Sequence, residues 1–506
     1  FEASEGVAEN TSNAAAGGMQ IMNTFSTRSV WWSTLRNLII SKMPEIIVRR
    51  FDPEQLPYFQ ISLLRTLSDP HFLRYFALFS RKSLFNSDTI QGQKNKRDMI
   101  HFTSFAVHQM IDFLHAHPEF AQRAGYSRRG ALRLLYSQAE IEHAKATNSW
   151  VGDRGCDMEP TVVLDNPDAV FELDPWLSLI DSQNKNIKGA LFQTCASMGN
   201  SQKTAQLFLE QLGNFELHDR FFENTNERFN QNEKLKLVHA PFGKEKVVGT
   251  FQGHFNTRLC EFCVRGEGEQ RQIDGLVFDT DARPVEVHPE RGDIVVSCLG
   301  AQTPVVFRKL GLFVPIYPLK GYDLVIDLDE TQAADFDTIP SRILFTDRSL
   351  YVSRLGNQIR VAAVGQYDGW RKRPTLSIKR KLKMHAKKLL PSTLHERIEQ
   401  HSTLVVGFRP HSADERIILG DVPTVENLYV NVGPGFNGWK IAYGASQVLA
   451  EYIDNNHSVE ATNASINQGL EKTFDISSLL PKDRIVYSPL FTKIVDILHQ
   501  FRDNDF

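Results

Sequence analysis

A glycine-rich turn between an apolar stretch and an amphipathic stretch is the part of this sequence best suited to chemistry. Residues 433–438 read GPGFNG and fit the pattern G-x-G-x-x-G. Glycines allow the backbone to approach a phosphate closely, and the first N–H groups of a following helix lack intrahelical partners and can bind an anion. Residues 428–453 therefore predict a strand, an anion-binding turn and a helix.

The residues after this predicted helix disfavour an NAD-binding unit. Such a unit needs a second strand that ends in Asp or Glu about 20 residues beyond the glycines. Residues 454–468 instead read DNNHSVEATNASINQ, which is polar and shows no strand pattern. The turn is therefore expected to do something other than bind NAD.

The composition is that of a globular protein and gives no sign of a nucleic-acid partner. The chain has 506 residues, of which 42% are hydrophobic and 23% are charged, and its net charge is −3. This length suggests two or three domains, and the balanced charge provides no basic footprint for nucleic acid. No apolar run reaches the length of a membrane-spanning helix. The basic stretch 371–388 is interpreted as a solvated helix face.

The five cysteines favour a reducing compartment, and they do not form a metal site. They are Cys156, Cys195, Cys260, Cys263 and Cys298, and their odd number and scattered spacing argue against a disulfide framework. Cys260 and Cys263 form a lone C-x-x-C, whereas zinc needs two further ligands. The surrounding RLCEFCVRG is predicted to be a strand that points these two side chains to opposite faces, so we expect a structural role.

The spacing of apolar residues predicts helical and strand regions in turn. Helices are predicted over 56–87, 98–117, 130–145, 201–212, 303–310 and 376–390, and helices are also expected in the C-terminal tail. Strands are predicted over 189–193, 322–328, 350–354, 358–364 and 416–420, with a buried strand within 292–300 and a meander within 234–281. The strands within 322–364 are expected to be antiparallel.

Four segments in this order resemble the FAD-dependent D-amino-acid dehydrogenase and glycine oxidase family. Residues 292–311 resemble the family's late strand and A-x-G turn, and residues 314–322 (VPIYPLKGY) resemble its P-x-Y-P-x-K-G-Y segment. Residues 407–414 resemble its G-x-R-P-x-x-x-D loop. Residues 433–439 resemble its G-H-G-x-x-G-W turn, with Pro434 where the family usually has histidine. The shared order is more specific than any single segment.

The resemblance implies an α/β fold with a Rossmann-like FAD-binding domain and an α+β substrate domain built on an antiparallel sheet. The expected boundaries are 1–30, 190–312 and 400–455 for the FAD-binding domain, 31–189 and 313–399 for the substrate domain, and 456–506 for a C-terminal extension. The extension and the helical stretch 95–150 are hypothesised to be docking surfaces, because they carry no family chemistry.

The resemblance also implies which residues contact FAD. Glu2 stands where the family has the acidic residue that binds the adenosine ribose, and Asn13 and Ala14 lie in a segment that resembles its S-x-x-N-A-G. The other expected contacts with FAD are Gly300, Gly433, Gly435, Gly438 and Trp439.

The family's first βα unit, which carries its own G-x-G-x-x-G turn, ends where this sequence begins. That unit holds the FAD pyrophosphate. It is expected to lie upstream of Phe1 or on a partner chain, and the protein is expected to be processed, truncated or split.

The implied reaction is hydride transfer from the α-carbon of an amino acid to flavin N5. The cofactor carries the difficult chemistry, so the protein mainly has to orient the substrate. Arg409 is expected to bind the substrate carboxylate, because a guanidinium matches a carboxylate through two parallel hydrogen bonds. The alternative is an ion pair with Asp414 or Glu415. Tyr322 is the second expected active-site residue, unless it packs in the core, and Lys320 either lies near the flavin or binds a local carbonyl.

A second hypothesis is an inactive flavoprotein-fold subunit with a structural role in a larger assembly. The absent phosphate-binding unit, Pro434 and the long extra segments favour it, whereas Glu2, Arg409 and the three glycines of the turn favour an enzyme. The enzyme would take a small amino-acid substrate. The expected location is mitochondrial, or otherwise cytoplasmic, with neither nucleic acid nor a transmembrane span involved.

Overall fold

The computed structural model describes most of the chain after residue 66. The described residues are 3–4, 8, 15, 17–19, 59–61, 66–86, 89–153, 161–184, 186–211, 253–267, 271–280, 283–329, 339–346, 350–374 and 376–502. The predictions for Glu2, Asn13, Ala14 and Cys156 lie outside these residues. None of the helices in the described part is long and apolar enough to cross a bilayer.

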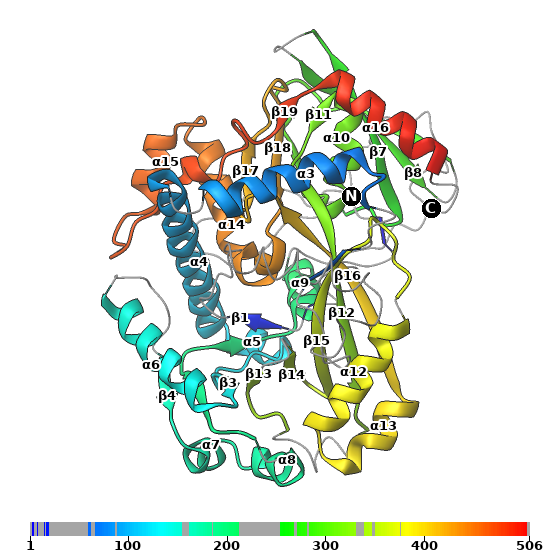
Figure 1. Ribbon diagram of the computed structural model, residues 1–506. Helices are drawn as coiled ribbons and strands as arrows, with labels where there is room; N and C mark the ends of the chain where they lie inside the picture. The colour runs from blue at the N-terminus through cyan, green and yellow to red at the C-terminus, as the bar shows by residue number, and fades with distance from the viewer. Residues whose placement is uncertain are drawn as a thin grey trace.

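A large, mainly antiparallel sheet forms the lower half of the molecule in Figure 1. Its strands are, in spatial order, β16 (Ser402–Ser412), β12 (Ile316–Asp327), β15 (Gln358–Tyr367), β14 (Tyr351–Leu355), β13 (Ile343–Phe345), β3 (Ala131–Leu135), β5 (Gly189–Gln193) and β4 (Thr161–Leu164), and β2 (Phe59–Ile61) also pairs with β15. The antiparallel pairing of β12, β15 and β14 confirms the prediction for residues 322–364.

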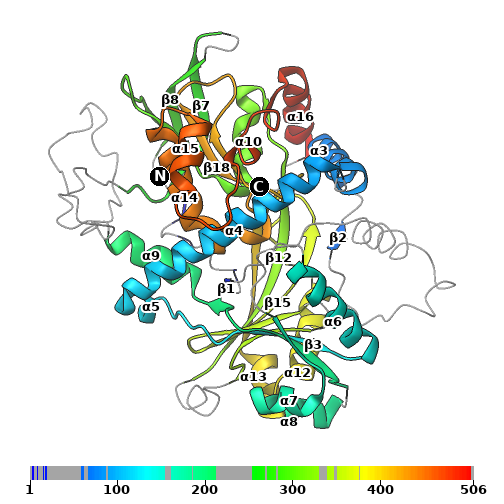
Figure 2. The same cartoon turned by 90° about the vertical axis from the view of Figure 1, so that its left-hand side faces the viewer.

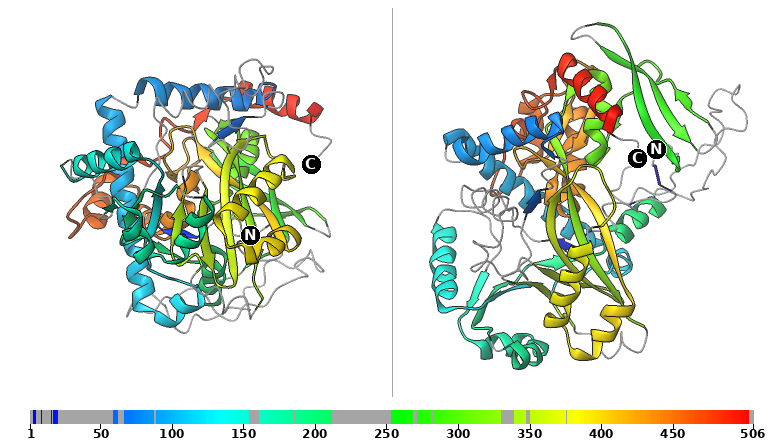
Figure 3. Two further views of the ribbon diagram at one scale, coloured as in Figure 1. Left: turned by 60° about the horizontal axis from the view of Figure 1, so that its bottom comes forward. Right: turned by 45° about the vertical axis from the view of Figure 1, so that its right-hand side comes forward.

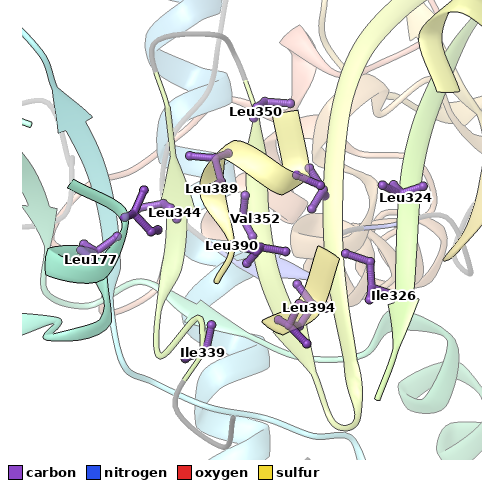
Figure 4. Packing of buried hydrophobic residues seen from close by; sticks show 14 of the residues in the cluster. Leu177, Leu324, Ile326, Ile339, Leu344, Leu350, Val352, Leu389, Leu390 and Leu394 are labelled. Atoms are coloured by element: carbon purple, nitrogen blue, oxygen red, sulfur yellow. The ribbon is translucent and has the colours of Figure 1, made fainter. Parts of the chain in front are cut away.

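One face of this sheet packs against helices to form the largest apolar core. The covering helices are α7 (Pro167–Leu173), α8 (Trp176–Asn184), α12 (Leu376–Leu389) and α13 (His395–Gln400). Figure 4 shows Leu324 and Ile326 of β12 and Val352 of β14 on the same side as Leu389 and Leu394. The apolar period of residues 376–389 puts Ile378, Leu382, Ala386 and Leu389 on the buried side of α12, and its lysines lie toward solvent or at the rim.

A smaller three-stranded sheet lies in the upper half. It consists of β10 (Val295–Ser297), β18 (Leu428–Val432) and β17 (Ile418–Asp421), with β10 and β18 parallel. The helix α14 (Gly438–Asp454) follows β18 and packs against it and α4 (Ile90–Ala116). Strand, turn and helix thus occur as predicted for residues 428–453.

The remaining elements surround this smaller sheet. A meander of β7 (Thr257–Arg265), β8 (Gln272–Thr280) and β9 (Val285–Val287) projects at the top in the right-hand view of Figure 3. The others are β1 (Gly18–Met19) paired with β6 (Ser197–Met198), β11 (Leu312–Phe313) paired with β19 (Val486–Tyr487), and the helices α3 (Pro70–Arg81), α5 (Pro118–Arg123), α6 (Gln138–Asp153), α9 (Ser201–Gln211), α10 (Thr303–Phe307), α15 (Val459–Ile466) and α16 (Pro489–Arg502).

Three predicted elements were wrong in part. Residues 131–135 form β3 before α6, because pairing with β5 and β13 overrides the local helical pattern. Residues 59–61 form β2, and α3 begins only at Pro70, where the Asp69 carboxylate accepts hydrogen bonds from the first backbone N–H groups. The strand within 292–300 is short and not fully buried, since Ile294 and Val296 are 48% and 43% exposed.

The C-terminal residues are integrated with the upper half of the molecule. Phe474, Ile476 and Leu479 belong to the apolar core between α4 and α14. The Arg308 Nε atom lies 3.1 Å from Asp496 on α16. The exposed side of α16 carries Leu490, Ile494, Ile497 and Leu498. A docking role for this region stays a prediction.

Close packing of α14 on α4 sets a steric requirement at Gly444. A Cβ atom on Gly444 would lie 2.5 Å from the Cβ of Ala106, and Figure 2 shows α4 running across α14. We expect Gly444→Val to lower the free energy of unfolding by about 2 kcal/mol, because the helices would have to separate. Ala442→Val on the exposed side of α14 is the control, and urea denaturation is the measurement. Equal effects of the two substitutions would contradict this contact.

Candidate active site

Arg409 lies on the face of the large sheet that is opposite the apolar core. It stands across from Leu319 in the pairing of β16 with β12. A Cβ atom on Gly321 would lie 2.6 Å from the Arg409 Cζ, so the guanidinium rests directly on this glycine and a side chain there would displace it. The same Cζ is 5.0 Å from the centre of the Phe436 ring, which belongs to the glycine turn. The fold therefore brings the predicted carboxylate-binding residue and the predicted cofactor turn together.

The Asp414 carboxylate, one of the two alternative partners expected for Arg409, pairs with two other arginines. It accepts hydrogen bonds from Arg416 at 2.6 and 3.0 Å and from Arg484 at 2.7 Å. Burial opposes ionisation of Asp414, but Arg484, Arg416 and Lys82 together hold its pKa below the usual range. Asp414 thus joins the connection between β16 and β17 to the C-terminal region.

The glycine turn has the backbone geometry that a close approach to a ligand requires. Gly433 and Gly435 have φ values of 74° and 58°, a region that favours glycine. The residue before α14, Asn437, makes no side-chain capping bond to the helix, and a short 3-10 turn (Gly435–Asn437) leads directly into α14, so the positive end of the helix lies at the glycine turn. Gly300 also has a positive φ of 56°, and no described atom lies within 4 Å of a Cβ placed there.

Trp439 connects this turn to the N-terminal segment. Its indole Nε1 donates to the carbonyl of Gly17 at 3.1 Å, and the backbone N–H of Gly199 donates to the same carbonyl at 2.9 Å. Gly18 then pairs with Met198. The structure thus places the segment that follows Asn13 and Ala14 in the sequence beside the start of α14.

His411 is a buried residue beneath the turn to which the sequence assigned no role. Its Nδ1 is 2.6 Å from the Tyr75 hydroxyl and 3.1 Å from the Tyr367 hydroxyl, within hydrogen-bond distance of both. Burial, together with Lys82 and Arg409, lowers the pKa of His411 to about 3, so the ring is neutral. It forms a backbone bridge with Pro434. The only sequence signal was that His411 departs from the family's small or polar residue.

Tyr322 and Lys320 lie on the other face of β12, away from Arg409. The Tyr322 hydroxyl donates to Gln366 Oε1 at 2.5 Å, and its ring belongs to the large apolar core. The Lys320 ammonium is fully buried and binds the Asp368 carboxylate at 2.7 Å and the Arg373 carbonyl at 3.4 Å. The fold does not bring Tyr322 together with Arg409, because adjacent residues of a strand alternate between faces.

The sheet face that carries Arg409 also has a second polar group, which the sequence analysis did not predict. Asp323 of β12 is 1% exposed, and its Oδ2 accepts a hydrogen bond from Arg360 of β15 at 3.1 Å. Tyr351 of β14 lies in the same row of the sheet, since Asp323 and Tyr351 both pair with Ala362. The sequence predicted strands at Asp323 and Tyr351, but the pairing that puts them on the same face as Arg409 joins distant segments and was not predictable from it.

The donor set suits a dinucleotide better than a metal ion. Within the described residues no group of three His, Cys, Asp or Glu side chains is placed to hold a metal. Cys195, Cys260, Cys263 and Cys298 are free thiols. By contrast, the segments that contain Gly300 and Gly435 both contact β16, and their left-handed glycines with the start of α14 are the kind of backbone that can approach a dinucleotide such as FAD.

The sequence match to known proteins covers the region that builds this site. Residues 261–452 match the family model DAO, FAD dependent oxidoreductase. A D-amino acid dehydrogenase from Methylobacterium nodulans is 33% identical over 162 residues, or 32% of this chain and 36% of the relative. One from Sinorhizobium medicae is 27% identical over 208 residues, or 38% and 48% of the two chains. The matched part thus spans about a third to a half of these relatives' lengths.

The structural match extends over more of the chain. A glycine oxidase from Geobacillus kaustophilus superimposes with a TM-score of 0.50 at 16% identity and covers 90% of this chain and 87% of its own. At this identity the likeness establishes the fold, a Rossmann-like FAD-binding part joined to a substrate part with an antiparallel sheet. Residues 261–452 are therefore similar in sequence to DAO-type FAD-dependent oxidoreductases, and the chain shares the fold of the glycine oxidase.

Proposed function

We propose that this protein binds FAD and oxidises an amino acid at its α-carbon, with hydride transfer to flavin N5. The observation that carries this proposal is the position of Arg409, whose guanidinium lies on Gly321 and against Phe436 of the glycine turn. A cationic fork fixed beside a cofactor cradle is what a substrate carboxylate needs for orientation. The D-amino acid dehydrogenases that match the sequence support an amino acid as the substrate class.

The residues that would hold FAD come from the segment at Gly300 and from the glycine turn that contains Phe436. Gly300, Gly433, Gly435 and the start of α14 at Gly438 would approach the cofactor, and Trp439 would hold the N-terminal segment beside it. Bound FAD supplies the hydride acceptor. The N-terminus of α14 is the positive end of the helix dipole, and it would stabilise negative charge on the part of the cofactor that lies nearest to it. Arg409 would fix the carboxylate, which leaves the α-carbon in one orientation.

The edge of the smaller sheet supports a further parallel strand in the complete FAD site. Within the described residues β10 pairs with β18 alone, and Ile294 and Val296 are about half exposed. An exposed strand edge with β-branched side chains is a template for another strand. We propose that a βα unit with the pyrophosphate-binding glycine turn pairs here, and that Glu2 binds the ribose.

Flavin content is the first test, and two glycines provide a matched pair of variants. We expect the purified protein to contain or take up about one FAD per chain, measured by visible absorbance and by identification of the released flavin. Gly300→Ala should weaken FAD binding at least tenfold, because the new methyl group would enter the open space. Gly356→Ala is the control, since Gly356 has a φ of 60° and equally open surroundings on the β14–β15 turn.

The outcomes separate the two hypotheses. If Gly300→Ala weakens FAD binding and Gly356→Ala does not, the enzyme hypothesis is supported. Amino acids can then be screened for flavin reduction. Failure to bind FAD, even with the phosphate-binding unit supplied, would contradict the proposal and favour the structural subunit.

A further inference from the structure

The sheet face beside Arg409 carries an acidic group in addition to the arginine. Gly321, on which the Arg409 guanidinium rests, and Asp323 are two residues apart on β12 and therefore share this face. Residues at this spacing lie about 6.7 Å apart along a strand. A carboxyl group is thus fixed next to a guanidinium on one buried surface.

Two polar atoms on this surface have no hydrogen-bond partner among the residues that the structure describes. They are the Asp323 Oδ1 and the Tyr351 hydroxyl oxygen, and both are fully buried. The other carboxylate oxygen, Oδ2, accepts from Arg360 at 3.1 Å. A purely structural ion pair of this kind would be expected to satisfy its remaining oxygen, because an unsatisfied buried polar atom is costly.

The two unpartnered atoms flank a small residue. Asp323 and Tyr351 both pair with Ala362, which stands between them on the central strand of the three. Ala362 lies on β15, between β12 and β14. Its methyl group is small, so it fills little of the space between the Asp323 and Tyr351 side chains. The Asp323 carboxylate and the Tyr351 hydroxyl therefore lie on the two sides of Ala362, and the hydroxyl also lies against Gly18 of β1, where a Cβ atom would be 2.0 Å from it.

We propose that Asp323 is the anionic partner of the α-ammonium group of the substrate, so that one sheet face holds both charged ends of an amino acid. This inference rests on the proposed function and extends it to the recognition of the nitrogen. The α-nitrogen and the carboxylate carbon of an amino acid are about 2.5 Å apart. With a charge-assisted bond of about 2.8 Å at each end, the span is roughly 8 Å, which is comparable with the separation of Gly321 and Asp323.

The charges around Asp323 are compatible with this role. Arg360 on β15 and Arg409 on β16 are the cations that face it, Tyr351 on β14 is neutral, and the Ala15 carbonyl accepts a bond from Arg360 at 3.4 Å. Burial raises the pKa of Asp323 to about 6, with the two arginines acting in the opposite direction. The group is therefore mainly ionised at neutral pH and becomes protonated in mild acid.

A pair of ligands that differ only in the nitrogen tests the inference. 2-Aminoisobutyrate has no α-hydrogen and cannot be oxidised, and pivalate has a methyl group in place of its ammonium. We expect the full FAD-loaded protein to bind 2-aminoisobutyrate at least tenfold more tightly than pivalate in calorimetric titrations. Asp323→Asn should lower the ratio of the two affinities about tenfold. The affinity for pivalate should change by less than about twofold.

A pH series and a second variant complete the test. Binding of 2-aminoisobutyrate to the native protein should weaken as the pH falls through about 6, whereas Asp323→Asn should lack this dependence. The double variant Asp323→Asn with Arg360→Gln leaves no unpaired charge and replaces the single variant if that one does not fold. An unchanged preference in the folded variant would overturn the inference and leave the proposed function intact. Failure of the native protein to bind either carboxylate would count against the proposed function itself.

Discussion

We expect Asp414→Asn to lower the free energy of unfolding by about 3 kcal/mol. This is the largest stability effect that we expect from a single substitution in the candidate site region. The Asp414 carboxylate lies between the guanidinium groups of Arg416 and Arg484, whose side chains are only 11% and 9% exposed. Removal of one member of a buried ionic group is costly because the remaining charges stay buried without compensation. Asn keeps the shape of the side chain and removes only the charge.

The pH dependence follows from the direction of the pKa shift. The folded state holds the pKa of Asp414 below its value in the unfolded chain, which is about 3.9. Its contribution to stability is therefore present above about pH 4 and is lost as the pH falls further. Urea denaturation of the native protein and of Asp414→Asn should give curves that differ at pH 7 and converge in acid.

An exposed carboxylate serves as the control for this measurement. Asp165 pairs with Lys145 at 3.0 Å, and both side chains are exposed to solvent. Exposed pairs contribute little, so Asp165→Asn should cause no measurable change. Equal urea midpoints for Asp414→Asn and Asp165→Asn at pH 7 would contradict this prediction. They would show that the buried Arg416 and Arg484 do not need the charge of Asp414 for stability.

Arg409→Lys should raise the KM for the substrate about 100-fold and should lower kcat/KM by at least as much. Lysine keeps the positive charge but loses the planar pair of donors that binds a carboxylate and stacks against Phe436. Loss of a bidentate, charge-assisted contact costs about 2–3 kcal/mol, which corresponds to this factor. Steady-state kinetics with the amino acid that reduces the flavin is the measurement.

Binding of FAD separates this effect from a general loss of structure. Arg409→Lys should keep its FAD content, because the arginine contacts the ring of Phe436 and the sheet rather than the glycines themselves. Arg354→Lys on β14 of the same sheet is the control, since the Arg354 guanidinium donates to the Gly356 carbonyl at an exposed turn. A native KM for Arg409→Lys would exclude a role for Arg409 in carboxylate binding.

The sequence by itself determined the local elements and the resemblance to a family. The apolar run of residues 428–432, the glycines and the helical period of residues 438–454 lie close together in the chain, so their pattern predicted β18, the turn and α14 directly. The alternation within 322–364 likewise predicted strands. Arg409 was predicted because its neighbours Gly407 and Pro410 match the family pattern.

The tertiary structure alone decided which side chains meet. Whether Tyr322 or Asp323 shares a face with Arg409 depends on the register of β12 against β16, and that register joins residues about 85 positions apart. The helix predicted over residues 130–145 was wrong at its start for the same reason, since pairing with β5 and β13 fixes residues 131–135 as a strand. Local periodicity reports the conformation that a segment prefers. The partners that bury its polar groups come from distant parts of the chain, so no local pattern reveals them.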